Sequence, residues 1–280
     1  MDTPFIEDFS PSLALREHVR KYQVFRLLFK KEALLPTKYH TPHPEHCLTF
    51  YPRDLQRYSH LRSPTVGTYP RCVINGFYNV PLNRHGGHDF LAIKVVFQPT
   101  TLFCLTGIPS QQLTNTFLDA QAVWGKEVGL VCQRLTSAQT LPEMLLILEK
   151  FLAYLFGHRL CQSGHAVDQT SRLMLHQPNA ASLAWLADQS SLSIRQFIRK
   201  FEQRLGISPK MFERIVRFDR AYRMKNAAPD LDWLSIALSC GYYDHQHLVR
   251  DYKEFTGLTP QSLFELERKS PERTFGLFEY

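Results

Sequence analysis

The chain has 280 residues, of which 44% are hydrophobic and 21% charged, a composition typical of a soluble globular protein with two domains. The formal net charge of +7 permits nucleic-acid binding without requiring it. No segment approaches the roughly 18 uninterrupted apolar residues of a membrane span, and the acidic N-terminus, MDTPFIEDFSPS, lacks the features of a signal peptide. We therefore expect a cytoplasmic protein that has no membrane partner.

The cysteines are scattered along the chain, at Cys47, Cys72, Cys104, Cys132, Cys161 and Cys240. None forms a C-x-x-C pair, which argues against a zinc ribbon or a thioredoxin-type site. In a cytosolic protein we expect such residues to be reduced and mostly buried. A redox sensor is the alternative, and it would need a thiolate in a basic or helix-terminal setting.

Residues 1 to about 110 are rich in prolines, aromatic residues and short apolar runs. The run FLAIKVVF at residues 90–97 has β-branched character and one charge, which predicts a buried strand. Turn signals separate three further predicted strands, at residues 48–51, 66–69 and 73–78. Several short strands with frequent turns predict a β-rich, sandwich- or barrel-like domain, which we place at residues 1–160 with the helices that complete it.

The pattern becomes helical from about Ser110. Residues 141–156 (LPEMLLILEKFLAYLF) have a helical rhythm in which Leu145, Leu148, Leu152 and Leu155 share one face. We expect this face to be covered by its own domain, and a second copy of the chain in a homodimer is the alternative. The polar segment GHRLCQSGHAVDQT at residues 157–170 predicts a linker to an all-helical domain at residues 170–268.

The region after residue 180 contains one pattern twice. The first copy is SLAWLADQSSLSIRQFIRKFEQRLGISP, from Ser182, and the second is WLSIALSCGYYDHQHLVRDYKEFTGLTP, from Trp233. From Ser193, which pairs with Asp244, the copies align at a constant offset of 51, and in the preceding helix the offset is 50. Each copy predicts a helix, a tight turn and a second helix, with one extra residue in the turn of the second copy.

The ends of the second helices carry recognisable capping residues. Ser193 and Asp244 are suited to N-caps, and Gln196 stands where a capping box with Ser193 requires it. Gly206 and Gly257 can adopt the left-handed geometry that ends a helix. We also expect two hydrophobic staples at these starts, which are Leu192 onto Phe197 and Tyr243 onto Leu248.

Each second helix has an apolar face and a polar face. Phe197, Phe201 and Leu205 make the core side of the first, and Leu248, Tyr252 and Phe255 that of the second. Arginine can bond guanine in two places, and glutamine can do so with adenine. Early positions in the second helix of such a unit favour DNA contact over simple solvation. The candidate DNA-binding residues are therefore Arg195, Gln196, Arg199, His245, Gln246 and Arg250.

Between the copies, residues 210–225 (KMFERIVRFDRAYRMK) predict one helix with an apolar stripe. Its Arg214, Arg217 and Arg220 have two open interpretations, contact with the DNA backbone or simple solvation. Residues 185–225 hold ten cations against four acids, so this stretch carries most of the excess charge of the chain. If the two units enter successive major grooves, their second helices should lie about 34 Å apart.

Four motifs carry a family resemblance. They are L-A-x-x-S-S-L-S at residues 186–193, F-x-x-x-x-G-I-S-P at 201–209, I-A-L-S-C-G-Y at 236–242 and Y-x-x-x-x-G-L-T-P at 252–260. This pattern resembles the C-terminal domain of the AraC/XylS family of bacterial regulators. The resemblance implies that one chain engages two adjacent grooves, with the arginines, His245 and Gln246 named above on DNA-facing positions. Residues 95–115 more weakly resemble the sensor-like domain of this family, which implies regulation by a bound effector.

Two other functions compete with this interpretation. Clustered histidines, His40, His43 and His46 with His85 and His88, could form a cupin-like metal enzyme or metal sensor if they converge, although a proline-rich loop explains them too. A helical protein-interaction domain that binds no DNA is the other. No nucleophile triad, phosphate-cradling glycine loop or paired-carboxylate motif stands out, so we expect no enzymatic activity, cofactor or metal.

The sequence thus predicts an α+β protein of two domains, with a β-rich N-terminal domain that includes helices and an all-α C-terminal domain with two helix-turn-helix units. The predicted function is sequence-specific DNA binding in transcription regulation, controlled by an effector in the N-terminal domain. The expected partners are double-stranded DNA, a small-molecule effector, RNA polymerase and a second copy of the chain.

Overall fold

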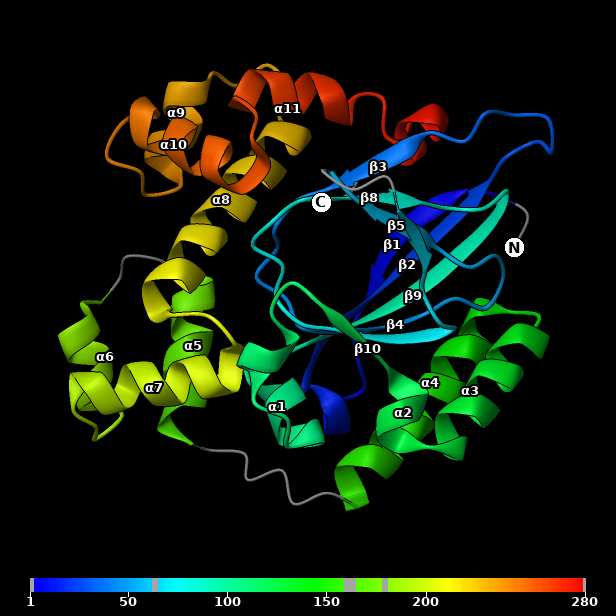
Figure 1. Cartoon of the computed structure of the whole chain (residues 1–280), viewed down its shortest axis with the longest axis horizontal. Helices are drawn as coiled ribbons and strands as arrows, with labels where there is room; N and C mark the ends of the chain where they lie inside the picture. Colours follow the sequence, from blue (N-terminus) through cyan, green and yellow to red (C-terminus); the bar gives the residue numbers. More distant parts are fainter. Residues whose placement is uncertain (1–2, 62–64, 159–164, 178–180, 279–280) are drawn as a thin grey trace.

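The computed structural model describes residues 3–61, 65–158, 165–177 and 181–278. A β-rich N-terminal part lies beside an all-helical C-terminal part, as Figure 1 shows, and this confirms the predicted fold class. Within the described residues, no helix combines the length and the apolar character needed to cross a bilayer.

The N-terminal part is built on two antiparallel sheets. In the larger sheet the strands follow the order β1 (Phe5–Phe9), β2 (Val19–Leu28), β9 (Asp89–Phe97), β4 (Cys47–Phe50), β7 (Cys72–Asn75) and β10 (Phe117–Asp119). In the smaller sheet the order is β3 (Thr37–His40), β8 (Leu82–His85), β5 (Arg57–His60) and β6 (Val66–Thr68). The four predicted strands correspond to β4, β6, β7 and β9, and the prediction for residues 73–78 runs too far.

Strand β9 shows how the larger sheet separates two environments. Alternate side chains of a strand point to opposite faces. Leu91, Ile93 and Val95 belong to the core shared with the N-terminal helices, whereas Phe90 and Lys94 line a cavity on the other face. The sheet is therefore covered by helices on one side and holds an internal cavity on the other.

The helices of the N-terminal part lie after β9 in the chain, with β10 between the first of them and the others. They are α1 (Thr101–Thr106), α2 (Ala120–Trp124), α3 (Lys126–Ser137) and α4 (Leu141–His158), with short 3-10 turns η1 (Leu13–Leu15) and η2 (Ser110–Leu113). On α4, Met144, Leu148 and Leu152 are buried in the core of the larger sheet. The apolar face of residues 141–156 is thus covered by its own domain, as predicted. The helical region begins earlier than predicted, at Thr101, and is interrupted by β10.

The C-terminal helices are α5 (Ala166–His176), α6 (Leu183–Gln189), α7 (Ile194–Leu205), α8 (Pro209–Ala227), α9 (Trp233–Ser239), α10 (His245–Thr256) and α11 (Pro260–Glu267). Helix α5 packs against α7 and α8, so this helical unit already starts inside the segment predicted as a linker. The rest of that linker, residues 159–164, lies outside the described residues.

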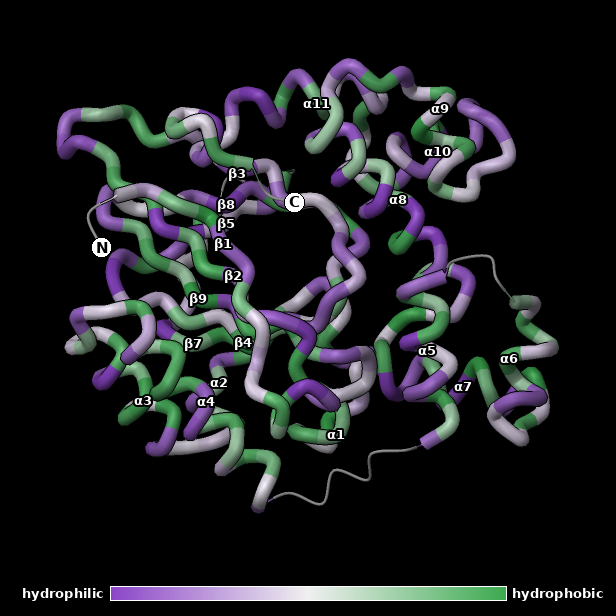
Figure 2. Tube along the Cα trace, turned by 180° about the vertical axis from the view of Figure 1, so that it is seen from behind, coloured by the Kyte–Doolittle hydropathy of each residue, from purple (hydrophilic) through white to green (hydrophobic). Residues whose placement is uncertain are grey.

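The chain ends on the N-terminal part. After α11, the turn η3 (Pro271–Phe275) places the Phe275 ring 4.9 Å from that of Phe29. In the rear view of Figure 2, hydrophobic residues recur along β2 and β9 and along the helices packed on them. The two parts are thus joined by packed contacts as well as by the chain.

Candidate nucleic-acid interface and its connection to the N-terminal cavity

The internal repeat is a repeat of structure. Helices α6 and α7 form the first unit, and α9 and α10 form the second. The Leu192 amide donates to the Ala187 carbonyl at 3.0 Å, and the Tyr242 amide donates to the Ala237 carbonyl at 2.9 Å. Leu192 and Tyr242 are thus equivalent at an offset of 50, and the extra residue in the second turn is Tyr243.

This extra residue overturns one of the two predicted staples. The Tyr243 side chain is 87% exposed, so it does not pack onto Leu248, and its ring lies edge-on to His247 with the centroids 6.0 Å apart. The preceding Tyr242 is buried in the core of the helical domain instead. In the first unit, Leu192 packs against the core that contains Phe197, in agreement with the predicted staple.

The predicted caps are confirmed. The Ser193 hydroxyl accepts from the Gln196 amide at 3.3 Å, and the Gln196 side-chain oxygen accepts from the Ser193 amide at 3.2 Å. The Asp244 carboxylate accepts from the His247 amide at 2.8 Å. Gly206 and Gly257 end the two helices with φ angles of 89° and 71°, which are left-handed.

The candidate DNA-binding side chains lie on the exposed faces of α7 and α10. Arg195, Arg199, His245, Gln246 and Arg250 are exposed. The buried apolar residues are the predicted ones, which are Phe197, Phe201 and Leu205 on α7 and Leu248, Tyr252 and Phe255 on α10. Gln196 is exposed as well, but its side-chain oxygen serves the capping box. A two-point contact of Gln196 with adenine would therefore break the cap of α7. Contact of all six with DNA stays a prediction.

The arginines of α8 lie against the protein. Arg214 pairs with Asp251 at 2.7 Å and with Glu254, and these partners raise its pKa. Arg217 lies over the Tyr242 ring, 5.1 Å from the centroid, and Arg220 donates to the backbone oxygens of the last turn of α5. These side chains hold α8 to its neighbours, an outcome that neither of the two predicted interpretations included.

Sequence reasoning missed a buried ion cluster between the two parts of the chain. Glu45 pairs with Arg20 at 2.6 Å and Lys94 at 2.5 Å, and with Arg223 of α8 at 3.6 Å. Burial alone would raise the pKa of Glu45, but these three cations hold it well below its usual range. The cluster ties the cavity wall directly to the helix that joins the two helix-turn-helix units.

A second contact beside this cluster also crosses between the parts. The His43 Nδ1 and Asp219 Oδ1 atoms lie 2.5 Å apart, and Arg223 pairs with the other oxygen of Asp219 at 2.7 Å. Burial opposes the charge of Asp219, yet Arg223 and His43 keep its pKa well below its usual range. The signal that sequence reasoning could have used is the single charge within the apolar run of residues 90–97, which is Lys94.

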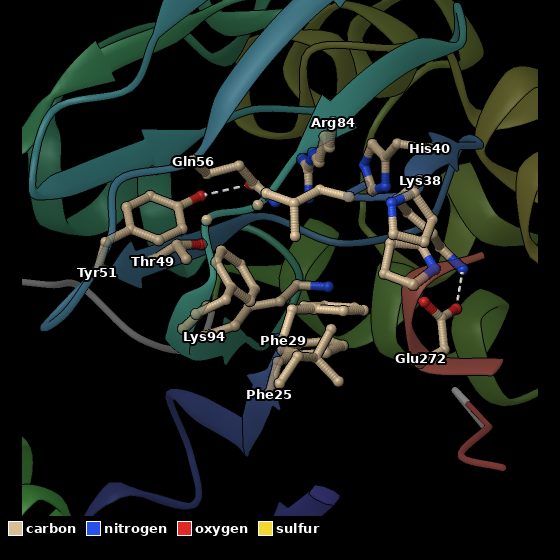
Figure 3. A pocket seen from close by; sticks show the side chains of 18 residues that line it. Phe25, Phe29, Lys38, His40, Thr49, Tyr51, Gln56, Arg84, Lys94 and Glu272 are labelled. Carbon is tan, nitrogen blue, oxygen red and sulfur yellow. Dashed lines mark hydrogen bonds and ion pairs between the residues drawn. The ribbon is translucent and has the colours of Figure 1, made fainter. Parts of the chain in front are cut away.

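The cavity lies between the smaller sheet and the larger one, and η3 closes part of it. In Figure 3, Lys38, His40 and Arg84 lie along one side, and the rings of Phe25 and Phe29 face them. Lys38 pairs with Glu267 at 2.7 Å and with Glu272, which also lines the cavity, at 2.5 Å. Apolar rings on one side and cationic side chains on the other suit a ligand with both apolar and anionic parts.

Arg84 differs from the other cations of the cavity. It is in contact with no carboxylate of the described residues, and its Nε atom is buried without a hydrogen-bond partner among them. A buried donor is costly unless an acceptor satisfies it. An anion or another acceptor in this cavity could therefore stabilise Arg84 by accepting from its Nε–H group.

The histidines of the metal-site alternative do not converge. His43 binds Asp219, His46 packs on Phe77, His85 contacts Thr37 and Ser59, and His88 contacts the Ala33 carbonyl. His40 lies beside His43, with the ring centroids 5.3 Å apart. Within the part of the chain that the structure describes, no three metal-binding side chains are gathered as a metal site requires.

Comparison with known proteins agrees with this description of the C-terminal part. A family model described as a helix-turn-helix domain matches residues 186–265. An uncharacterised HTH-type transcriptional regulator of Haemophilus influenzae is 34% identical over 89 residues, which are 31% of this chain and 29% of that protein. This chain therefore spans less than a third of the curated relative that it matches.

The fold of the whole chain also has a counterpart among solved structures. An apo form of a ToxT variant from Vibrio cholerae aligns with a TM-score of 0.50 and 9% identity. The alignment covers 88% of this chain and 97% of that one. The likeness concerns the arrangement of a β-rich part followed by a helical part.

Proposed function

We propose that the chain is a sequence-specific, DNA-binding transcription regulator of the AraC type, because its residues 186–265 match a helix-turn-helix family model and 89 residues of the chain resemble an HTH-type transcriptional regulator. The observation that carries the proposal is the pair of capped helices α7 and α10, each of which exposes polar and cationic side chains on one face and buries an apolar face on the other. In units of this kind the second helix enters the major groove and its first turns meet the bases. One chain would then occupy two neighbouring grooves.

The candidate residues divide by the chemistry that they offer. Arg195 and Arg199 on α7 and Arg250 on α10 offer two-point contacts to guanine or charge to phosphate, and Gln246 offers a two-point contact to adenine. We assign Gln196 mainly to the cap of α7, because its side-chain oxygen is already used there. Contacts with RNA polymerase and with a second copy of the chain stay predictions.

Binding to selected DNA tests this proposal. Duplexes selected by the wild-type chain from random sequence serve as probe, and Arg199→Ala and Arg250→Ala are compared with Arg134→Ala, which removes the same charge from an exposed site on α3. We expect each of the first two to lose about 1–3 kcal/mol of binding free energy, or roughly 5- to 150-fold in affinity, and the control to change little. Full affinity in both variants, or no sequence selected at all, would refute the assignment.

We further propose that the N-terminal cavity binds the effector and that the effector is a small organic anion with an apolar part. The support is the half-buried Arg84, whose Nε atom is buried without a hydrogen-bond partner, opposite the rings of Phe25 and Phe29. Lys38 and Lys94 line the same cavity and pair with Glu272 and Glu45 at the boundary with the helical domain. An anion in the cavity competes for these lysines, so its binding would change how the helical domain is held.

Simple carboxylates test the effector proposal. Octanoate and benzoate serve as probes, and the melting temperature of the full chain is followed as each is added. We expect a rise for at least one probe in the wild type and in Lys21→Met, and none in Arg84→Met. Lys21 pairs with the exposed carboxylate of Asp8 and does not line the cavity, so its variant controls for loss of charge. Equal rises in all three chains would place the binding elsewhere.

A further inference from the structure

A second hollow, remote from the cavity in sequence and in lining, contains two cysteines. It lies where β7 and the start of α2 meet α3, and its lining includes Arg71, Cys72, Asp119, Gln121, Gly129 and Cys132. None of these residues takes part in the proposed DNA interface or in the effector cavity. The hollow therefore needs an explanation of its own.

The two cysteines line the same hollow. Cys72 is the first residue of β7 and is 2% exposed, and Cys132 on α3 packs against the core cluster that contains Cys72. Cys132 is half-buried and forms part of the wall of the hollow. Gly129, one turn earlier on α3, lines the same wall without a side chain, which leaves the approach to Cys132 open. A small solute can thus reach Cys132, while Cys72 lines the same hollow and is almost fully buried.

The environments of the two sulfurs differ in the way that a reactive pair requires. A hydrogen bond from Cys72 and the nearby charge of Arg71 lower the pKa of Cys132, although burial opposes them. Burial, together with the same hydrogen bond, raises the pKa of Cys72 well above its usual range. The thiolate is the nucleophilic form, so Cys132 is suited to attack an oxidant first, and Cys72 to attack the oxidised Cys132 afterwards.

We propose that Cys132 and Cys72 form a modification site that a hydroperoxide oxidises to a disulfide between β7 and α3. The Cys132 thiolate attacks one peroxide oxygen, the O–O bond breaks, and Cys132 becomes a sulfenic acid while the other oxygen leaves as hydroxide or alkoxide. The Cys72 sulfur then attacks the Cys132 sulfur, the S–O bond breaks, and the hydroxyl leaves as water with the proton of Cys72. Two thiols lose two electrons in total, and these reduce the peroxide.

Mass spectrometry of the intact, folded full-length chain tests the proposal, with hydrogen peroxide as oxidant. We expect the mass to fall by two hydrogen atoms, a digest to contain a Cys72–Cys132 linked peptide, and a dithiol reductant to reverse both changes. Cys104→Ser is the matched control, because Cys104 is another half-buried cysteine with an arginine contact, from Arg204 at 3.4 Å. It should form the same linked peptide, whereas Cys132→Ser should not.

The replacement of Cys72 separates the two steps. In Cys72→Ser, oxidation should stop at a Cys132 sulfenic acid, which dimedone traps. If Cys72→Ser does not fold, detection of the Cys72–Cys132 linked peptide in the wild type still tests the proposal. The proposal is overturned if native wild type keeps Cys72 and Cys132 as reduced as the buried Cys47, if the linked peptides join other cysteines, or if the link arises only after unfolding in urea.

Discussion

The two helix-turn-helix units share a sequence pattern but are held by the N-terminal domain in different ways. At the end of α7, the Ser110 hydroxyl donates to the Arg204 carbonyl at 2.8 Å, and the Thr114 hydroxyl donates to the Gly206 carbonyl at 2.9 Å. At the end of α10, the contact is made by the longer side chain of Tyr39, whose hydroxyl donates to the Thr256 carbonyl at 2.6 Å. The first unit is thus held by two short hydroxyl side chains, which bring η2 close to the backbone of α7, and the second by one long side chain.

This difference bears on how a signal could pass between the domains. Both sets of hydrogen bonds reach the C-terminal ends of the candidate recognition helices, where the helix carbonyls are otherwise unsatisfied. The exposed N-terminal halves of α7 and α10 stay clear for a nucleic acid. Strand β3 lines the proposed effector cavity with Lys38 and His40 and carries Tyr39, so a change in the cavity can reach the contact with α10 without touching the DNA-facing residues.

The equivalent glycines Gly206 and Gly257 give the largest expected contrast. Both have left-handed φ angles, but a Cβ at Gly206 would lie 2.6 Å from the Ser110 carbonyl oxygen, whereas a Cβ at Gly257 meets nothing within 4 Å. We expect Gly257→Ala to cost about 1 kcal/mol from backbone strain, and Gly206→Ala to cost about 3 kcal/mol because overpacking adds to that strain. Urea unfolding measures the totals, and hydrogen exchange of α7 and α10 amides assigns them to the units. Similar losses in the two variants would show that the close approach of η2 to α7 has no energetic importance.

Acid should weaken the packing of the N-terminal part against the start of α8. His46 packs on Phe77, which contacts Phe212 at the start of α8, and burial lowers the pKa of His46 to about 4. Between this value and the unfolded value of about 6.5, the unfolded chain binds more protons, so stability falls as the pH is lowered through that window. We expect a loss of about 2 kcal/mol between pH 7 and pH 5 from this residue.

The variant His46→Phe keeps the apolar packing and removes the proton site, so it should show a shallower decline of the unfolding free energy over the same range. Tyr39→Phe, which removes the hydrogen bond to α10, serves as the comparison. In this variant the unfolding free energy should decline with falling pH as steeply as in the wild type, because tyrosine does not titrate at these pH values. Parallel slopes for wild type and His46→Phe would contradict the role of His46.

The sequence allowed the helical domain to be predicted in more detail than the β-rich one. Capping residues and left-handed glycines act over a few positions, so Ser193, Asp244, Gly206 and Gly257 could be interpreted without any tertiary information. The longest strand of the larger sheet, β2, was missed because Arg20 and Arg26 interrupt its apolar residues. Those charges are accommodated by Glu45 and Asp89, which are distant in sequence.

The candidate site was likewise predictable where it depends on local sequence, and not where it depends on residues distant in the chain. The exposed positions on α7 and α10 follow from helical periodicity, whereas the role of Arg214 depends on Asp251 and Glu254 of another helix. The contact between His43 and Asp219 joins residues that no local pattern relates. Tyr243 could have been recognised as the inserted residue only from the backbone hydrogen bonds that make Leu192 and Tyr242 equivalent.

The smallest expected effect lies in the turns of the two units. Ser191 has a left-handed φ of 50°, and the equivalent residue of the second unit, Gly241, has a φ of 81°. A left-handed conformation costs a residue with a Cβ about 1–2 kcal/mol, and the extra freedom of glycine in the unfolded chain returns about 0.5–1 kcal/mol of this. We therefore expect Ser191→Gly to stabilise the chain by about 0.5 kcal/mol, and Gly241→Ser to destabilise it by a similar amount.

Paired urea denaturation curves measure both changes, and the double exchange should leave the unfolding free energy nearly unchanged because the turns are equivalent in backbone geometry. A loss of stability in Ser191→Gly would mean that the serine side chain stabilises its turn by more than the strain costs, and that the equivalence of the two turns does not extend to their energetics.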